Sequence, residues 1–362
     1  MAERDGLGAL AGWNVIRLSD IFGQDDAIAW LRRAVESDRL PHGLMFAGPT
    51  GVGKATTARA LAAGFLCGKP NGADACGACE SCRVMAAGTH PDFHEIVKEH
   101  IRYYDKTGKS KGISLSIDVV RPELIEPAGR KPAMGRGKAF VIEQADLMQP
   151  NAQNAMLKTL EEPAGRTLIV LLTDQPGALL PTIQSRCQLV QFASLDESLV
   201  RRELEKHKID KKTAADAAAL AGGSLGVALK WIEDGVIDPA RDLVAQVDAM
   251  LRGNPPDDLP DWLKKAADAY AEKQLERDEL ASKDQANREG LILYLHVAAT
   301  RFRKRLAETS DPDELDRACT AIEVLARAEE YLDANVNVAL TLQQLAVTLE
   351  RTLAAQGQRQ NA

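Results

Sequence analysis

Short apolar runs alternate with amphipathic stretches between about residue 18 and residue 193. Four of the runs are almost continuously aliphatic or aromatic, which predicts strands covered by helices on both faces, because a half-exposed strand would alternate polar and apolar positions. The predicted strands are Leu44–Ala47, Phe93–Val97, Ala139–Ile142 and Leu168–Thr173. Strands that alternate with helical stretches indicate a parallel sheet, so we expect an α/β domain over residues 1–193.

The hydrophobic pattern changes after Phe192, where strand-like runs end. Three stretches have helical spacing, with a break at Gly222-Gly223-Ser224 that separates the last two. They are Asp196–Lys206, Thr213–Leu220 and Leu225–Ile232. This pattern predicts a small three-helix domain over residues 194–237.

Beyond Asp238 the chain keeps a helical pattern that is interrupted by turn-forming residues. These interruptions are Gly253-Asn254-Pro255-Pro256 and Ser310-Asp311-Pro312. We therefore expect a third, all-α domain over residues 238–362, and a fold class of α/β plus all-α for the chain. A length of 362 residues also exceeds what one hydrophobic core usually supports.

Charge and composition narrow the class of protein. With 45 basic and 52 acidic residues the net charge is −7. Tight binding of nucleic acid by a lone chain requires an excess of basic residues, which this chain lacks. The weakly apolar segment Gly6–Ile16 follows Glu3, Arg4 and Asp5 and lacks the features of a leader peptide. We expect a cytoplasmic protein without a membrane span, which meets nucleic acid only within an assembly.

A basic segment, Lys98–Lys111, follows the second predicted strand and contains five lysines or arginines with Tyr103 and Tyr104. A solvated insertion loop is the commoner structure for such a segment. A contact with a nucleic-acid backbone, with the aromatic rings stacking on bases, is the alternative.

A glycine-rich segment, Gly48-Pro49-Thr50-Gly51-Val52-Gly53-Lys54, lies between the first predicted strand and the helical stretch Ala55–Phe65. In such a loop the backbone N–H groups and the helix N-terminus point at an anion, while the lysine reaches the outer phosphates. The order of strand, loop and helix predicts a phosphate loop. Its candidate binding residues are Gly48, Gly51, Gly53 and Lys54, and ATP or ADP is the candidate ligand.

The groups that hold magnesium beside a working phosphate loop are replaced. Ala55 stands where a serine or threonine hydroxyl binds Mg²⁺, and Thr56 lies about 100° further around the helix. After the third predicted strand comes Glu143-Gln144, where ATPases of this kind carry Asp followed by a Glu that orients water. A neutral amide cannot accept a proton from water. We expect no hydrolysis, and leave open whether the loop holds a nucleotide.

Four cysteines, Cys67, Cys76, Cys79 and Cys82, follow the helix after the phosphate loop with the spacing C-x8-C-x2-C-x2-C. An all-cysteine shell is typical of a structural zinc site, so we expect a zinc module at about residues 67–82. An iron–sulfur cluster is the alternative, although its fourth cysteine normally lies downstream of such a run. Cys187 and Cys319 are isolated, and we expect both to be small buried hydrophobic side chains.

Several segments within residues 18–235 together resemble one family. They are Phe22-Gly23-Gln24, Pro41-His42-Gly43-Leu44, the four cysteines, Asn151-Ala152-Gln153-Asn154-Ala155-Met156-Leu157-Lys158-Thr159-Leu160-Glu161-Glu162-Pro163 and Pro181-Thr182-Ile183-Gln184-Ser185-Arg186-Cys187. The last two are the most specific. The chain resembles the δ′ (delta prime) family of bacterial DNA polymerase III clamp-loader subunits, a branch of the AAA+ group. This resemblance implies an AAA+ domain, a lid of three helices and a helical collar.

The resemblance also implies a function and partners. Subunits of this family form a pentameric ring with γ/τ and δ subunits, and the ring opens the sliding clamp and places it on primed DNA. A δ′ subunit does not hydrolyse ATP, but it supplies an arginine finger to a neighbouring ATPase site. In this sequence the finger would be Arg186, whose guanidinium would offset charge on the γ-phosphate.

A γ/τ motor subunit, which hydrolyses ATP, is the alternative within the same group. Motor subunits keep the magnesium hydroxyl, the Asp-Glu pair and an arginine in the lid. Here these positions hold Ala55, Glu143-Gln144 and Gly226, so each departure favours the δ′ interpretation.

Overall fold

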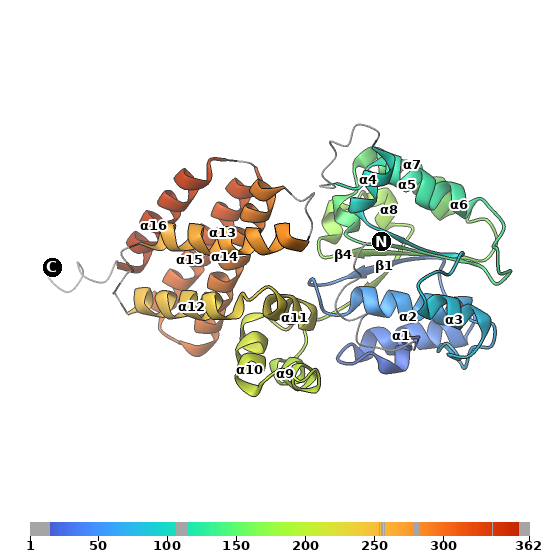
Figure 1. The fold of residues 1–362 in the computed structure, drawn as a ribbon, viewed down its shortest axis with the longest axis horizontal. Coiled ribbons are helices and arrows are strands. Elements are labelled where there is room, and N and C mark those ends of the chain that lie inside the picture. The colour runs from blue at the N-terminus through green and yellow to red at the C-terminus, as the bar shows by residue number, and fades with distance from the viewer. Residues whose placement is uncertain are drawn as a thin grey trace. The chain divides into compact units, whose positions relative to one another are not determined.

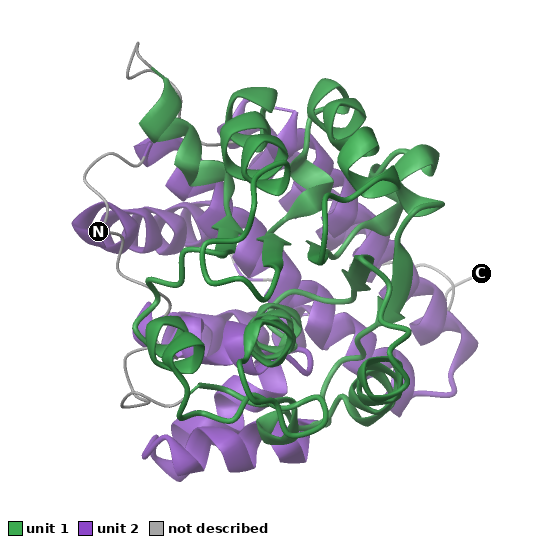
Figure 2. Cartoon of the chain, turned by 90° about the vertical axis from the view of Figure 1, so that its right-hand side faces the viewer, with its two compact units in different colours: residues 1–196 green, residues 197–362 purple. Residues whose placement is uncertain are grey.

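A computed structural model describes residues 15–105, 114–252, 254, 256, 258–277, 282–334 and 336–354. The chain divides into two compact units, residues 1–196 and residues 197–362 (Figure 2). The sheet lies in the first unit, and the described part of the second unit is helical. The expected boundary at residue 237, inside the second unit, stays a prediction.

Five strands of the described residues form one sheet in the order β2-β3-β4-β1-β5, and every neighbouring pair is parallel. Their bounds are β1 (Gly43–Ala47), β2 (Phe93–Ile96), β3 (Lys138–Ile142), β4 (Thr167–Thr173) and β5 (Gln188–Gln191). The four predicted strands are confirmed, each to within one residue at either end. β1, β3 and β4 are buried throughout, whereas β2 at the edge is only partly buried.

Strand β5 was not predicted, and its sequence explains why. It reads Gln-Leu-Val-Gln, and within it only Val190 is buried, because β5 pairs with β1 at the other edge of the sheet. A short edge strand with exposed glutamines gives no continuous apolar run.

Helices cover both faces of the sheet (Figure 1). Helices α1 and α2 pack on one face, around Leu44 and Phe46 of β1, while α5, α7 and α8 pack on the other face, around Met45. The helices of this unit are α1 (Asp25–Glu36), α2 (Lys54–Leu66), α3 (Glu80–Ala86), α4 (Ile101–Tyr104), α5 (Ile117–Val120), α6 (Glu126–Ala128), α7 (Pro150–Glu161) and α8 (Pro181–Gln184). Because successive side chains of β1 point to opposite faces of the sheet, the strand contributes to two separate hydrophobic cores.

The second unit begins with the three predicted helices, which are confirmed. They are α9 (Glu197–Lys206), α10 (Lys211–Leu220) and α11 (Leu225–Glu233). Asp210 caps α10 by accepting hydrogen bonds from the N–H groups of Lys212 and Thr213, and Ser224 caps α11 by accepting from Val227. The break before α11 contains Gly222 and Gly223, both with positive φ, a conformation that favours glycine.

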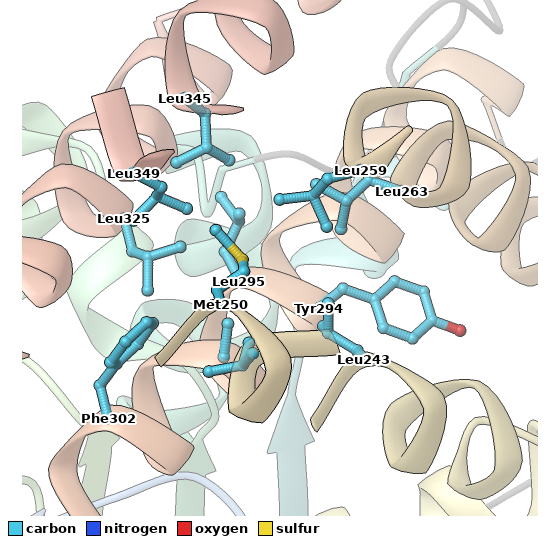
Figure 3. Close-up of a pocket in the computed structure, with 12 residues that line it drawn as sticks. Leu243, Met250, Leu259, Leu263, Tyr294, Leu295, Phe302, Leu325, Leu345 and Leu349 are labelled. Carbon is cyan, nitrogen blue, oxygen red and sulfur yellow. The ribbon is translucent and has the colours of Figure 1, made fainter. Parts of the chain in front are cut away.

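Five longer helices complete the second unit: α12 (Ile237–Leu251), α13 (Leu259–Arg277), α14 (Lys283–Glu308), α15 (Pro312–Asp333) and α16 (Val338–Ala354). Their apolar sides meet in one core, where a small hollow is lined almost entirely by carbon (Figure 3). Residues from all five helices line it, among them Met250, Leu263, Phe302, Leu325 and Leu349. The hollow is thus part of the hydrophobic core of these five helices.

Lysine 138, the first residue of β3, is almost fully buried. Its ammonium group donates hydrogen bonds to the carbonyl oxygens of Ala128 and, at 2.6 Å, Arg130, just beyond the end of α6. The last carbonyls of a helix have no partner within the helix, so this lysine satisfies them. Burial lowers the pKa of Lys138, whereas the nearby carboxylate of Asp92 acts in the opposite direction.

Replacing this side chain should destabilise the first unit. We expect Lys138→Met to lower the free energy of unfolding by about 2–3 kcal/mol, because it leaves buried carbonyls without a donor. Equilibrium unfolding in urea measures the change. The exposed Lys131→Met is the matched control, and its effect should stay within about 0.5 kcal/mol. Equal losses in the two variants would contradict the assigned role.

Candidate functional site

The predicted phosphate loop connects β1 to α2 in the structure. Gly51 and Gly53 have φ angles of 74° and 104°, which side chains with a Cβ rarely adopt. At Gly48 a Cβ would lie 2.2 Å from the carbonyl oxygen of Phe192, so only glycine fits between β1 and the segment after β5. The backbone that presents N–H groups to an anion is therefore built into this chain.

The side chain of Gln24, in the motif Phe22-Gly23-Gln24, links this loop by hydrogen bonds to the segment after β5. Its amide nitrogen donates to the carbonyl oxygens of Val52, at 3.1 Å, and Ala193, at 2.8 Å, and its amide oxygen accepts from the N–H of Ala193. The glutamine is almost fully buried, and its pairing on both sides fixes the loop relative to the end of the sheet.

The ammonium group of Lys54 is turned toward the loop itself. It donates to the carbonyl oxygens of Gly48, at 2.5 Å, and Pro49, at 2.8 Å. Burial lowers the pKa of Lys54, whereas the nearby carboxylates of Asp174 and Asp146 act in the opposite direction. The lysine is thus held inside the loop, at the position from which it could contact a phosphate group.

The positions that would hold magnesium carry different chemistry. Ala55 offers no hydroxyl, and the hydroxyl of Thr57 donates to the carbonyl oxygen of Gly53. The Glu143 carboxylate lies 3.1 Å from the guanidinium of Arg59, which also pairs with Glu95 at 2.6 Å. Mg²⁺ prefers several oxygen ligands in octahedral geometry. A missing hydroxyl and a carboxylate already paired with arginine do not fit that requirement.

The four cysteine sulfurs lie together, all within 4.8 Å of one another. The Sγ–Sγ distances are 3.8 Å for Cys67 and Cys79, 3.9 Å for Cys76 and Cys82, and 3.6 Å for Cys67 and Cys82. Sulfurs bound tetrahedrally to one zinc ion at 2.3 Å are about 3.8 Å apart. The geometry therefore fits a single tetrahedral ion.

Backbone groups prepare these sulfurs for a metal ion. The N–H of Cys76 points at the Sγ of Cys67 at 3.3 Å, and the N–H of Cys79 points at the Sγ of Cys76 at 3.4 Å. Hydrogen bonds from the backbone of Ala78 and Cys79 lower the pKa of Cys76 to about 6, whereas burial raises the pKa of Cys67 and Cys82. A thiolate is the form that binds metal, and the hydrogen bonds to the Cys76 sulfur favour that form.

The cysteine cluster lies far from the phosphate loop. Helix α2 begins at Lys54 and ends at Leu66, one residue before Cys67, and its 13 residues span about 20 Å at 1.5 Å per residue. Any ion held by the cysteines is therefore too distant to contact a phosphate in the loop. Such an ion would stabilise the fold of the segment that carries the four cysteines.

Arg186 lies between α8 and β5, on the surface of the first unit. Its Nε donates to the Glu161 carboxylate at 2.7 Å, Nη2 contacts the same oxygen, and Nη1 donates to the carbonyl oxygen of Thr182 at 3.0 Å. Arg186 was predicted from the sequence as a site residue, whereas its ion pair with Glu161 was not predicted.

The structure places Arg186 and the phosphate loop at opposite ends of β1. A Cβ on Gly43, the first residue of β1, would lie 3.0 Å from the carbonyl oxygen of Arg186, whereas the loop follows Ala47, the last residue of β1. The four residue steps between them span about 13 Å at 3.3 Å each. Arg186 is therefore remote from the loop of its own chain.

Several other features considered in the sequence lie outside the phosphate loop and the cysteine cluster. Part of the basic segment Lys98–Lys111, residues 106–111, falls outside the described residues, and Tyr103 in the described part is exposed. Gly226 lies within α11, and Cys187 is buried as expected. Cys319 is exposed, so the expectation that it is a buried side chain was wrong. Of the helices that the structure describes, none combines the length and apolar character needed to cross a bilayer.

The chain is similar to known subunits of bacterial DNA polymerase III. A family model described as DNA polymerase III, delta subunit, matches residues 23–196. The DNA polymerase III subunit delta′ of Pseudomonas aeruginosa is 35% identical over 214 residues, or 58% of this chain and 62% of that protein. The Escherichia coli subunit delta′ is 34% identical over 208 residues, which cover 55% of this chain and 59% of that protein.

A tau subunit is also similar. The DNA polymerase III subunit tau of Salmonella typhimurium is 30% identical over 252 residues, or 68% of this chain and 37% of that protein. The chain spans about three fifths of the length of the delta′ relatives that it matches. The family match and the relatives from different bacteria support a bacterial DNA polymerase III clamp-loader subunit, δ′ or γ/τ.

Proposed function

We propose that this chain is a non-hydrolysing δ′ subunit of the AAA+ type, which supplies Arg186 to the ATPase site of a neighbouring subunit. The separation of Arg186 from its own phosphate loop by the length of β1 carries the proposal. An arginine that completes a nucleotide site must approach the γ-phosphate. Because Arg186 is distant from Lys54, a site on another subunit is the one that it can serve.

The chemistry beside the phosphate loop supports the same proposal. Ala55 and Gln144 lack the hydroxyl and the carboxylate that hydrolysis needs, and Glu143 is paired with Arg59. Gly48, Gly51, Gly53 and Lys54 keep the backbone and cation of a phosphate site. We infer that ATP or ADP, when held there, stays unhydrolysed.

The proposed partners follow from the family. In a ring with γ/τ and δ subunits, the chain would help to open the sliding clamp and to place it on primed DNA, and residues 194–237 and 238–362 would act as lid and collar. The net charge of −7 fits a subunit that meets DNA through an assembly.

A γ/τ-type ATPase is the second candidate, favoured by the similarity of 252 residues to a tau subunit and by the complete glycine pattern of the loop. A steady-state assay on the purified chain separates the two. We expect no magnesium-dependent ATP turnover above background, and no change in Lys54→Ala, because the metal ligands are missing. Turnover that Lys54→Ala abolishes would establish the motor.

Removing the proposed finger should slow a neighbour. In a complex reconstituted with its partner subunits, we expect Arg186→Ala to slow hydrolysis at the adjoining site by a factor on the order of 10³, so that only the turnover of the other sites remains. Gel filtration should show normal assembly, because the Arg186 side chain is partly exposed. Arg130→Ala, whose side chain is 73% exposed, is the control. An unchanged ATPase rate would remove the finger assignment.

We propose that the four cysteines hold structural zinc. Elemental analysis should find about one zinc ion per chain in a colourless protein, and Cys79→Ser should lose the ion and unfold at a lower temperature, since a closed shell contributes folding energy. The exposed Cys319→Ser is the matched control and should keep the ion. Brown protein that contains iron would contradict zinc.

A further inference from the structure

Three segments that lie far apart in the sequence converge beside Arg186. They are the start of β1 with His42 and Gly43, the end of α7 with Leu160 and Glu161, and the turn after α8 that carries Arg186. The proposed function uses only the arginine, so the other two segments need a separate explanation. All three lie at the amino end of β1, away from the phosphate loop.

Glu161 takes two of the guanidinium nitrogens of Arg186. Both Nε, at 2.7 Å, and Nη2 contact the same oxygen, Oε1, while Nη1 is held by the carbonyl oxygen of Thr182 at 3.0 Å and the hydroxyl of Ser185 at 3.3 Å. A planar guanidinium that is held along two edges has its direction fixed. The side chains are 35% and 46% exposed, so solvent screens the pair and it contributes little to stability. The ion pair instead fixes the orientation of the Arg186 guanidinium.

The end of α7 is itself fixed, so Glu161 is not a freely moving partner. The Nε2–H of His42 donates to the carbonyl oxygen of Leu160 at 2.6 Å, and the His42 carbonyl accepts from the N–H of Ile169 in β4 at 2.7 Å. This joins the last turn of α7 to the sheet.

On the other side, the absence of a side chain at Gly43 lets the backbone of Arg186 approach. A Cβ there would lie 3.0 Å from the Arg186 carbonyl oxygen and 3.4 Å from Cδ2 of Leu160. The backbone of Arg186 and the end of α7 are thus held against the same point of β1.

We propose that Glu161 is a positioning residue for Arg186, which presets the guanidinium for a phosphate group on a neighbouring subunit. This inference rests on the proposed function and deepens it. Glu161 does not contact the phosphate; it fixes the direction in which the finger leaves the surface. A reacting group displaced by about 1 Å can lose on the order of 10²-fold in rate, so orientation has a measurable value.

The test compares four variants in the complex reconstituted with wild-type partner subunits: Glu161→Gln, Glu162→Gln, Arg186→Ala and the double variant Glu161→Gln/Arg186→Ala. Glutamine keeps the shape of Glu161 but removes the charge. Glu162 is the matched control, because it is the next residue, is exposed and follows the last residue of α7. The readout is the Arg186-dependent part of kcat, with KM for ATP measured separately.

We expect Glu161→Gln to lower the Arg186-dependent kcat by about tenfold, with KM unchanged, because a misdirected finger affects the transition state more than nucleotide binding. Glu162→Gln should match the wild type, and the double variant should equal Arg186→Ala alone. A merely structural role would instead lower the thermal stability of the isolated chain and add to the effect of Arg186→Ala.

Two results would overturn the inference while leaving the finger in place: an unchanged Arg186-dependent rate in Glu161→Gln, or an increased one, which would show that Glu161 restrains the finger. A wild-type rate in Arg186→Ala would overturn the proposed function itself. The two failures are therefore distinguishable.

Discussion

The parallel arrangement of the sheet is the constraint on which the candidate sites depend. Because all neighbouring strands are parallel, every carboxyl end lies at one edge of the sheet and every amino end at the other. The phosphate loop, Glu143 and Asp174 follow the carboxyl ends of their strands, whereas Arg186 precedes the amino end of β5. The topology thus assigns the two kinds of site to different sides of the unit, before any side chain is considered.

Two carboxylates beside the phosphate loop, those of Glu95 and Glu143, are both paired with Arg59. Glu95 and Glu143 come from neighbouring strands, and two half-buried carboxylates there would repel each other without a cation. Arg59, one turn along α2 from Ala55, supplies a positive charge from within the chain. The charges of the two carboxylates are therefore balanced from within the chain.

The sequence predicted what depends on continuous patterns and on residue chemistry. The buried strands, the three helices from residue 197, and the clustering of the four cysteines are confirmed, since long apolar runs and close cysteine spacing leave few alternatives. Strand β5 was missed because its glutamines face solvent. The contacts of Arg59 with Glu95, Gln24 with Val52 and Arg186 with Glu161 were also beyond prediction, since each joins segments separated by 25 residues or more and depends on tertiary structure.

Strand β1 is hydrogen-bonded on both sides, to β4 and to β5, and it is buried along its full length. A strand in this position can neither stretch nor slide without breaking a ladder on each side. In the ring proposed above, its five residues would act as a spacer of constant length between the chain's own phosphate loop and the neighbouring site to which Arg186 is proposed to contribute. The spacing of successive sites around the ring would then be determined within the fold of the single chain.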